Sequence, residues 1–180
     1  MKILISYYIN EINITFSINE FPPLYDDYKK VAILFEEIDY DEEYDYFLIC
    51  YITSNSDSST HILLNMKFSL YSSGFVPGFL VAPETNLLFI GAGERLIIYD
   101  FENSTRIGID KADFGFLGWR RSRDVIIMSA ELELACWNIN GRKLWSTFVE
   151  PPYEYEIKDN NLTLTIMGSK QEFNIYKGPE

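Results

Sequence analysis

The sequence is poor in cysteine, in histidine and in long apolar segments. Its 180 residues include two cysteines and one histidine, and two cysteines are too few for the disulfide framework of a small secreted domain. A single bridge between Cys50 and Cys136 stays open. No run of about 18 apolar residues is present, so we expect no transmembrane helix. The first residues, MKILISYYINEINITF, include Glu11 and lack a small-residue cleavage site, which is unlike a signal peptide. We therefore expect a cytoplasmic protein.

The same scarcity bears on catalysis. A Ser-His-Asp or Cys-His arrangement would have to use His61, and nothing near it in the sequence supports such a site. Two distant cysteines and one histidine do not have the spacing of a zinc site. Gly91-Ala92-Gly93 leads from one predicted strand into another, so it lacks the helix N-terminus that binds phosphate. The sequence predicts a protein that is not an enzyme and needs no cofactor; a catalytic site that forms only in three dimensions stays an alternative.

Positive charge is scarce as well. Fifteen Lys and Arg residues against 27 Asp and Glu residues give a formal net charge of −12. This acidity argues against binding to nucleic acid or to an anionic membrane. It suits a basic protein partner, and it also keeps a protein soluble. Arg120, Arg121 and Arg123 form a basic cluster that is expected either to bind an acidic partner or phosphate, or to pair with the chain's own carboxylates.

Apolar residues make up 47% of the chain and aromatic residues 16%, which is too apolar for disorder and favours strands. Residues 1–19 alternate between apolar and polar side chains and predict a hairpin that turns at Asn10-Glu11. Prolines, first-turn aspartates and helical spacing predict one helix at about 23–38, with a strand at Val31–Phe35 as the alternative. Further strands are expected at Tyr46–Thr53, His61–Leu70 and Phe79–Ala82.

The second half of the chain contains one unit about three times. The copies are Leu87–Phe101, Val125–Ile139 and Leu162–Tyr176, which start 38 and 37 residues apart. A polar turn precedes each copy, and four short strands fill each period, which is close to the period of a propeller blade. Asn140-Gly141, directly after the second copy, predicts a type I′ hairpin turn between two strands, because both residues tolerate a positive φ.

One segment within these copies, WNINGRKLW at Trp137–Trp145, resembles the tryptophan-bearing repeat of quinoprotein-type and WD-like β-propellers. In that repeat a Thr-Gly-Lys turn precedes a tryptophan, and Asn140, Gly141, Arg142 and Trp145 occupy the matching places. The first copy departs from the pattern, because Ile107 replaces the tryptophan. Across residues 79–176 the resemblance implies blade-like sheets, and it does not imply a quinone cofactor.

The predicted fold is therefore mainly β, with antiparallel four-stranded blade-like repeats in a small or incomplete propeller; a β-sandwich is the alternative. We expect a single domain over 1–180, with a divergent N-terminal half at 1–82 and repeated units at 83–176. One way to close it pairs Glu172–Tyr176 with a strand from 1–18.

An acidic segment, EEIDYDEEYD at residues 36–45, is predicted to be an exposed loop, because its carboxylates repel one another and stay in water. A calcium loop is the weaker alternative, since the turn glycine and the closing glutamate are missing. Tyrosines interleaved with acids favour recognition of a basic protein. The predicted partner-binding residues are Glu36, Glu37, Asp39, Tyr40, Asp41, Glu42, Glu43, Tyr44 and Asp45.

In its size, acidity and lack of a reaction centre the chain is similar in character to bacterial immunity proteins, which inhibit a cognate toxin by charge-complementary contact. This likeness predicts a non-catalytic protein that binds a basic partner such as a toxin domain. A propeller-like scaffold in a larger assembly and an enzyme with a hidden site are the alternatives. The sequence does not determine the oligomeric state.

Overall fold

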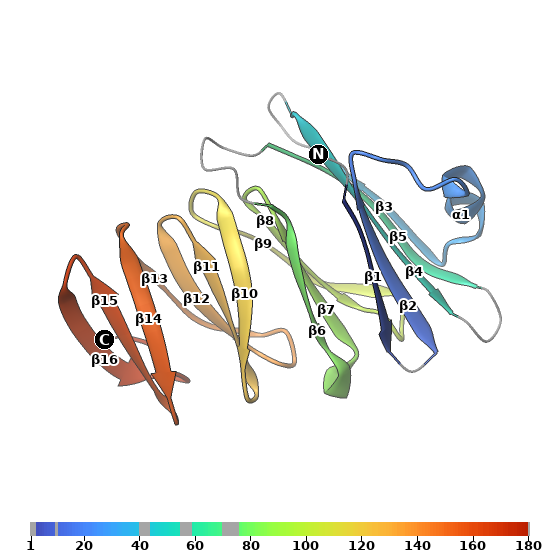
Figure 1. Ribbon diagram of the computed structural model, residues 1–180. Helices are drawn as coiled ribbons and strands as arrows, with labels where there is room; N and C mark the ends of the chain where they lie inside the picture. Colours follow the sequence, from blue (N-terminus) through green and yellow to red (C-terminus); the bar gives the residue numbers. More distant parts are fainter. Residues whose placement is uncertain (1–2, 10, 40–43, 55–58, 70–75, 180) are drawn as a thin grey trace. The chain divides into compact units, whose positions relative to one another are not determined.

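A computed structural model describes residues 3–9, 11–39, 44–54, 59–69 and 76–179 (Figure 1). The fold of the described residues is mainly β, with mostly antiparallel sheets and one α-helix, as the sequence predicted. The chain forms two compact units, residues 1–70 with 99–106, and residues 71–98 with 107–180. The single-domain assignment to 1–180 stays a prediction. Within the described ranges, no helix is both long and apolar enough to span a bilayer.

The first unit contains a five-stranded sheet in the order β1-β2-β4-β5-β3. Ile9 of β1 pairs with Ile12 of β2, which confirms the N-terminal hairpin. The central strands β4 and β5 contribute most of the buried apolar side chains of this sheet. Its elements are β1 (Ile3–Ile9), β2 (Ile12–Ile18), α1 (Tyr25–Val31), β3 (Leu34–Ile38), β4 (Tyr46–Ser54) and β5 (Thr60–Phe68).

The helix expected at about 23–38 is shorter than predicted. It ends at Val31, and Leu34–Ile38 continues as β3, parallel to β5. The aspartates of its first turn and the lysines of its last turn both complement the helix dipole. After the helix, residues 34–38 form backbone hydrogen bonds with β5. A longer helix would not add this strand to the sheet. The helix prediction thus holds for Tyr25–Val31, and the strand alternative at Val31–Phe35 is right only for Leu34 and Phe35.

The second unit carries three sheets, which we call the first, second and third blade sheets (Figure 1). In the first blade sheet, the corner that connects β8 to β9, residues 99–106, belongs to the first unit. In the described part of the chain β16 pairs only with β15 and β1 only with β2, so the predicted closure between the chain ends is wrong. The first sheet is β6 (Gly78–Ala82), β7 (Leu87–Ala92), β8 (Arg95–Asp100) and β9 (Thr105–Lys111), with a 3₁₀ turn at Pro83–Thr85; the second is β10 (Phe116–Ser122), β11 (Val125–Ala130), β12 (Glu133–Asn138) and β13 (Lys143–Phe148); the third is β14 (Tyr153–Lys158), β15 (Asn161–Ile166) and β16 (Ser169–Asn174).

The second blade sheet is buried on both faces. Along β11, Ile126 and Met128 belong to the apolar core shared with the first sheet. Val125 and Ile127 alternate with them and belong to the core shared with the third sheet. Because successive side chains of a strand point to opposite faces, a strand between two sheets must be apolar at every position. This double burial explains the uninterrupted apolar run that begins at Val125.

The third copy of the repeat lies one residue out of the predicted register. Backbone N–H groups of Ile139 and Ile175 donate to Asp124 and Asn160, so equivalent residues of the second and third sheets are 36 apart rather than 37. Leu162 therefore does not correspond to Val125; it points back toward the second sheet. A shift of one residue exchanges the two faces of a strand, and apolar spacing alone did not distinguish the two registers.

A side-chain cap recurs where the third strand of each blade sheet ends. The side-chain Oδ1 atoms of Asp100, Asn138 and Asn174 each accept a hydrogen bond from the backbone N–H two residues later, at 3.0–3.1 Å. Such Asx turns fix the chain reversal. The third unit therefore contains this turn as well, at Asn174.

The turn at Asn140-Gly141 is not the predicted type I′ turn, because Gly141 alone of the pair has a positive φ. Its N–H donates to the carbonyl of Asn138 at 3.0 Å, so the turn spans four residues and ends on the glycine. Met167 and Gly168, between β15 and β16, both have a positive φ, as a type I′ turn requires.

Two of these turns receive a side chain from the preceding sheet. A Cβ atom on Gly141 would lie 3.3 Å from Cγ2 of Ile107, and one on Gly178 would lie 2.6 Å from Cγ of Trp145. The indole N–H of Trp145 also donates to the carbonyl of Ile175 at 2.7 Å. Ile107 and Trp145 thus have the same role, although the sequence treated the isoleucine as a departure from the repeat.

The outward face of the third sheet is polar. Asn161, Thr163, Lys170 and Glu172 lie there, exposed or half-buried, at positions that are apolar in the second sheet. The corresponding residues of the second sheet are Val125, Ile127, Leu134 and Cys136. This face is suited to water rather than to packing against a further apolar sheet.

We expect Gly178→Ala to lower the free energy of unfolding by about 2–4 kcal/mol, because it adds a strained positive φ and a clash with Trp145. Gly168→Ala is the matched control: its φ is +84°, but no atom lies within 4 Å of the added Cβ, so about 1 kcal/mol is expected. Urea denaturation of both variants measures the difference. Equal losses would contradict the docking of Trp145 on the turn.

Candidate functional site

The predicted acidic segment is only partly a loop. Glu36 and Glu37 lie in β3, opposite Leu64 and Asn65 of β5, so the expected exposed loop does not begin at Glu36. A strand forms there because the alternating side chains include Ile38, which is buried. Asp39, Tyr44 and Asp45 follow β3 and are exposed. The remaining predicted residues, Tyr40, Asp41, Glu42 and Glu43, lie outside the described residues.

Glu36 is held by an intramolecular network. The hydroxyl of Tyr99 donates to its Oε2 at 2.6 Å, and Nη1 of Arg106 donates to its Oε1 at 2.8 Å. Burial, and then the neighbouring Glu36 carboxylate, raises the pKa of Tyr99. This network joins β3 to the β8–β9 corner within the first unit. Charge reversal at Glu36 would therefore disturb folding as well as any partner contact.

Two further acids of the segment also have cationic neighbours. Oε2 of Glu37 lies 3.7 Å from Nζ of Lys29, and Oδ1 of Asp39 lies 2.6 Å from Nζ of Lys67. The Lys67 ammonium lies 4.9 Å from the ring centroid of Tyr44. Asp45 instead accepts a hydrogen bond from Ser69 at 3.3 Å. The described part of the segment is thus largely neutralised, and Asp39 is engaged with a lysine rather than with a cation site.

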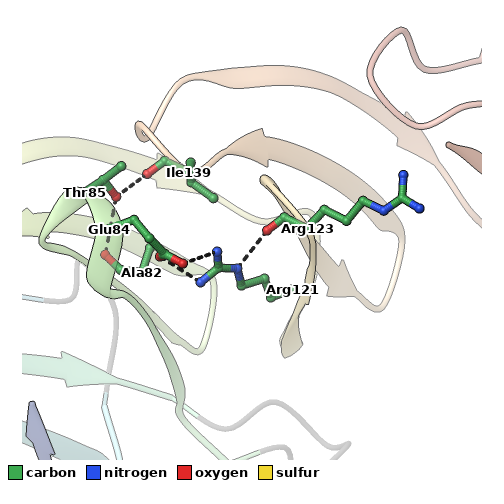
Figure 2. Close-up of polar contacts among 6 residues, drawn as sticks. All are labelled: Ala82, Glu84, Thr85, Arg121, Arg123 and Ile139. Atoms are coloured by element: carbon green, nitrogen blue, oxygen red, sulfur yellow. Dashed lines mark hydrogen bonds and ion pairs between the residues drawn. The ribbon is translucent and has the colours of Figure 1, made fainter. Parts of the chain in front are cut away.

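The arginine cluster pairs with the chain's own acids, as one of its two interpretations predicted. Arg121 binds Glu84 through two hydrogen bonds of 2.8 and 3.0 Å, and its Nε donates to the carbonyl of Arg123 (Figure 2). Arg123 extends away from this pair toward the next turn, where it binds Asn160 at 2.8 Å and Asp159 at 3.6 Å. Arg120 lies over the ring of Tyr155.

These contacts join the polar turns that precede the repeated units. Glu84 belongs to the turn of the first blade sheet, the arginines to that of the second, and Asn160 to that of the third. Thr85 adds a hydrogen bond of 2.6 Å from its hydroxyl to the carbonyl of Ile139 (Figure 2). The basic cluster therefore fixes adjacent sheets relative to one another, and its guanidinium groups are already engaged.

A pocket of about 180 Å³ opens between the first and second blade sheets. Two tryptophan rings, Trp119 and Trp137, form part of its wall, with centroids 5.5 Å apart. We call it the inter-sheet pocket. It is lined by Leu96, Ile98, Gly108, Ile109, Asp110, Trp119, Trp137, Gly141 and Lys143.

Lys143 supplies the positive charge of the inter-sheet pocket. Its ammonium lies 3.0 Å from Asp110, 3.1 Å from the buried Glu133 and 5.0 Å from the ring centroid of Trp137. Burial disfavours the charged form of Lys143, but hydrogen bonds to Asp110 and Glu133 together outweigh it and raise its pKa. Two carboxylates for one ammonium leave this cluster with a formal charge of −1.

The rim of the inter-sheet pocket is apolar and open to solvent. Ile107 and Ile109 project from β9, the edge strand of the first sheet, and Ile109 is 51% exposed. Exposed aliphatic side chains beside a pocket are typical of a binding surface. This site was not predicted from the sequence, because its walls come from five strands and one turn. Isoleucines on either side of Gly108 in an otherwise polar strand were the available signal.

The two cysteines and the histidine, which could carry covalent or acid–base chemistry, do not line the inter-sheet pocket. Both cysteines are free and buried, and burial raises the pKa of Cys50 and brings that of Cys136 to about 12. Nδ1 of His61 is buried and has no hydrogen-bond partner among the residues that the structure describes. Across the described segments, no three His, Cys, Asp or Glu side chains come together as a potential metal site.

No protein-family model matches this chain, and no curated protein matches it. Among solved structures it is similar to BamB from Moraxella catarrhalis, with 7% identity and a TM-score of 0.45, over 89% of this chain and 39% of that one. It is also similar to Sqt1 from Saccharomyces cerevisiae, with 9% identity and a TM-score of 0.44, over 72% and 41%. The chain thus spans about two fifths of the length of each.

We expect Arg121→Gln to raise the pKa of Glu84, which hydrogen bonds from Arg121 hold below its ordinary value. Because the folded-state pKa is the lower one, this pair stabilises the fold above the unfolded-state pKa and ceases to do so as the pH falls through the folded-state value. Carboxyl titration by NMR measures the shift. Arg120→Gln, which does not contact Glu84, should leave it unchanged; a similar shift in both variants would contradict the pairing.

Proposed function

We propose that this chain is a non-catalytic protein-binding module whose inter-sheet pocket takes one apolar side chain of a partner. The observation that carries the proposal is the pocket itself, with two tryptophans in its wall and exposed isoleucines on its rim. Its volume of about 180 Å³ lies below the roughly 300–1,000 Å³ of sites that enclose cofactors and drug-sized ligands. A single side chain is a better match, as in the pockets that anchor protein interfaces.

The charge of the chain specifies the partner further. With a net charge of −12, association is favoured for a basic protein. The local charge of −1 beside Lys143 has the same sign. A partner segment with an apolar anchor between lysines or arginines fits both features.

The buried thiols and the isolated histidine support a non-catalytic role. A nucleophilic cysteine needs a lowered pKa, whereas burial moves both thiols the other way. A general base needs a neighbour that orients it, and Nδ1 of His61 has none among the described residues. These arrangements favour binding over chemistry.

An immunity protein that inhibits a basic bacterial toxin in the cytoplasm is the more specific form of this proposal. Its acidic contact would use the segment at residues 36–45. Because Glu36, Glu37 and Asp39 already have cationic neighbours, Asp45 is the described acid best suited to steering a partner. A scaffold role in a larger assembly would use the same pocket without this dependence on charge.

We expect Ile109→Asp to abolish binding of peptides selected against the wild-type chain from a displayed random library. The substitution places a carboxylate on an exposed rim, so the fold should persist. Selected peptides should share one large apolar residue flanked by lysine or arginine, and should change the fluorescence of the pocket tryptophans. Phe148→Asp, 63% exposed and outside the pocket, is the control and should bind normally. Peptides that bind Ile109→Asp as tightly as the wild type would refute the site.

For a basic protein partner identified by cross-linking, we expect Asp45→Lys to slow association at low salt several-fold, with little effect on dissociation. Raising the ionic strength should remove the difference, because screening weakens steering. Stopped-flow fluorescence measures both rates. Asp27→Lys, on the exposed helix, is the charge-matched control. Equal rates for Asp45→Lys and the wild type would exclude the acidic segment, and with it the immunity-type contact, while leaving the pocket to be judged by the peptide experiment.

A further inference from the structure

Strand β1 forms one end of the five-stranded sheet in the first unit. All seven of its residues pair with β2, from Ile3 opposite Ile18 to Ile9 opposite Ile12. The sheet order begins at β1, so its outer edge has no strand neighbour in the described part of the chain. The backbone groups along such an edge are a template for another strand.

This edge lacks the features that normally prevent pairing. Its sequence, ILISYYI, contains no charged residue, proline or glycine, whereas natural edge strands often carry lysine or proline. Leu4 and Tyr8 are 69% and 66% exposed on one face, and Ile5 and Tyr7 are partly exposed on the other. Both faces of the edge are therefore apolar and open.

We propose that β1 pairs antiparallel with β1 of a second copy of this chain, across a two-fold axis at Ser6. The strand is self-complementary in this register: Leu4 lies opposite Tyr8 of the partner copy, and Ile5 opposite Tyr7. Aliphatic–aromatic cross-strand pairs are favourable, and a two-fold axis makes each pair occur twice. The two sheets then continue as one across the interface.

The absence of charged side chains along β1 permits a second copy at this place. Two chains of charge −12 repel one another, and β1 offers a contact with no like charges facing across it. Added salt screens the repulsion and strengthens the dimer, opposite to its effect on a basic partner. The contact is about 23 Å long at roughly 3.3 Å per residue, which is small for a permanent interface. The dimer is therefore weak and concentration-dependent.

Sedimentation equilibrium of the full chain at several concentrations and salt levels tests the proposal. The wild type should show a monomer–dimer equilibrium that shifts toward dimer as salt rises. Leu4→Lys and Tyr8→Lys should each be monomeric, because two lysines then meet uncharged neighbours within a pairing edge. Met167→Lys, 65% exposed in the β15–β16 turn, is the control and should dimerise as the wild type does.

Oxidative cross-linking tests the register independently. Ser6→Cys brings two thiols opposite one another at the two-fold axis, with Cβ atoms about 4.5–5.5 Å apart, and should give a disulfide-linked dimer. Tyr8→Cys should cross-link poorly, because residue 8 faces residue 4 of the other copy. A wild type that stays monomeric throughout overturns the proposal, including the case in which a different protein covers β1. So does a dimer unaffected by Leu4→Lys and Tyr8→Lys, or equal cross-linking of both cysteine variants.

Discussion

Double-sided burial of the second blade sheet is the constraint on which the repeated half of this protein depends. Ile126 and Met128 pack toward the first sheet, while Val125 and Ile127 pack toward the third. A strand can pack against a sheet on each side only if successive residues are apolar. The register of the strand then decides which of these residues face each neighbouring sheet. Each sheet consequently fixes the register of the next, so the stack behaves as one core divided into layers.

The turns convert this stacking into a defined spacing. Asx caps at Asp100, Asn138 and Asn174 end equivalent strands, and Trp145 docks on the turn that follows Asn174. Polar contacts such as Arg121–Glu84 add a second link at the opposite turns. Exposed ion pairs are individually weak, so their main contribution is to select one arrangement of sheets that the apolar core already favours.

The surface groups that are not engaged in contacts within the chain indicate where a partner could bind. The arginine cluster, for which the sequence left a partner or the chain's own acids open, and the described carboxylates of β3 are engaged within the chain. Two described surfaces that can still bind a partner are apolar: the rim of the inter-sheet pocket and the outer edge of β1. In so acidic a chain, charge then decides which partners approach these apolar surfaces, and neither surface needs a reactive group.

The sequence by itself determined the class of fold, the approximate positions of the strands in the repeated half and the N-terminal hairpin, because alternation and turn residues act over a few neighbours. For the 23–38 segment it gave a helix and a strand as alternatives and placed the strand too early, since the ladder between β3 and β5 is a long-range contact. Only the tertiary structure decided the register of the third unit, the partners of Glu36 and Arg121, and the inter-sheet pocket. Each of these depends on which residues distant in sequence meet across two sheets, and periodicity within one segment carries no information about that.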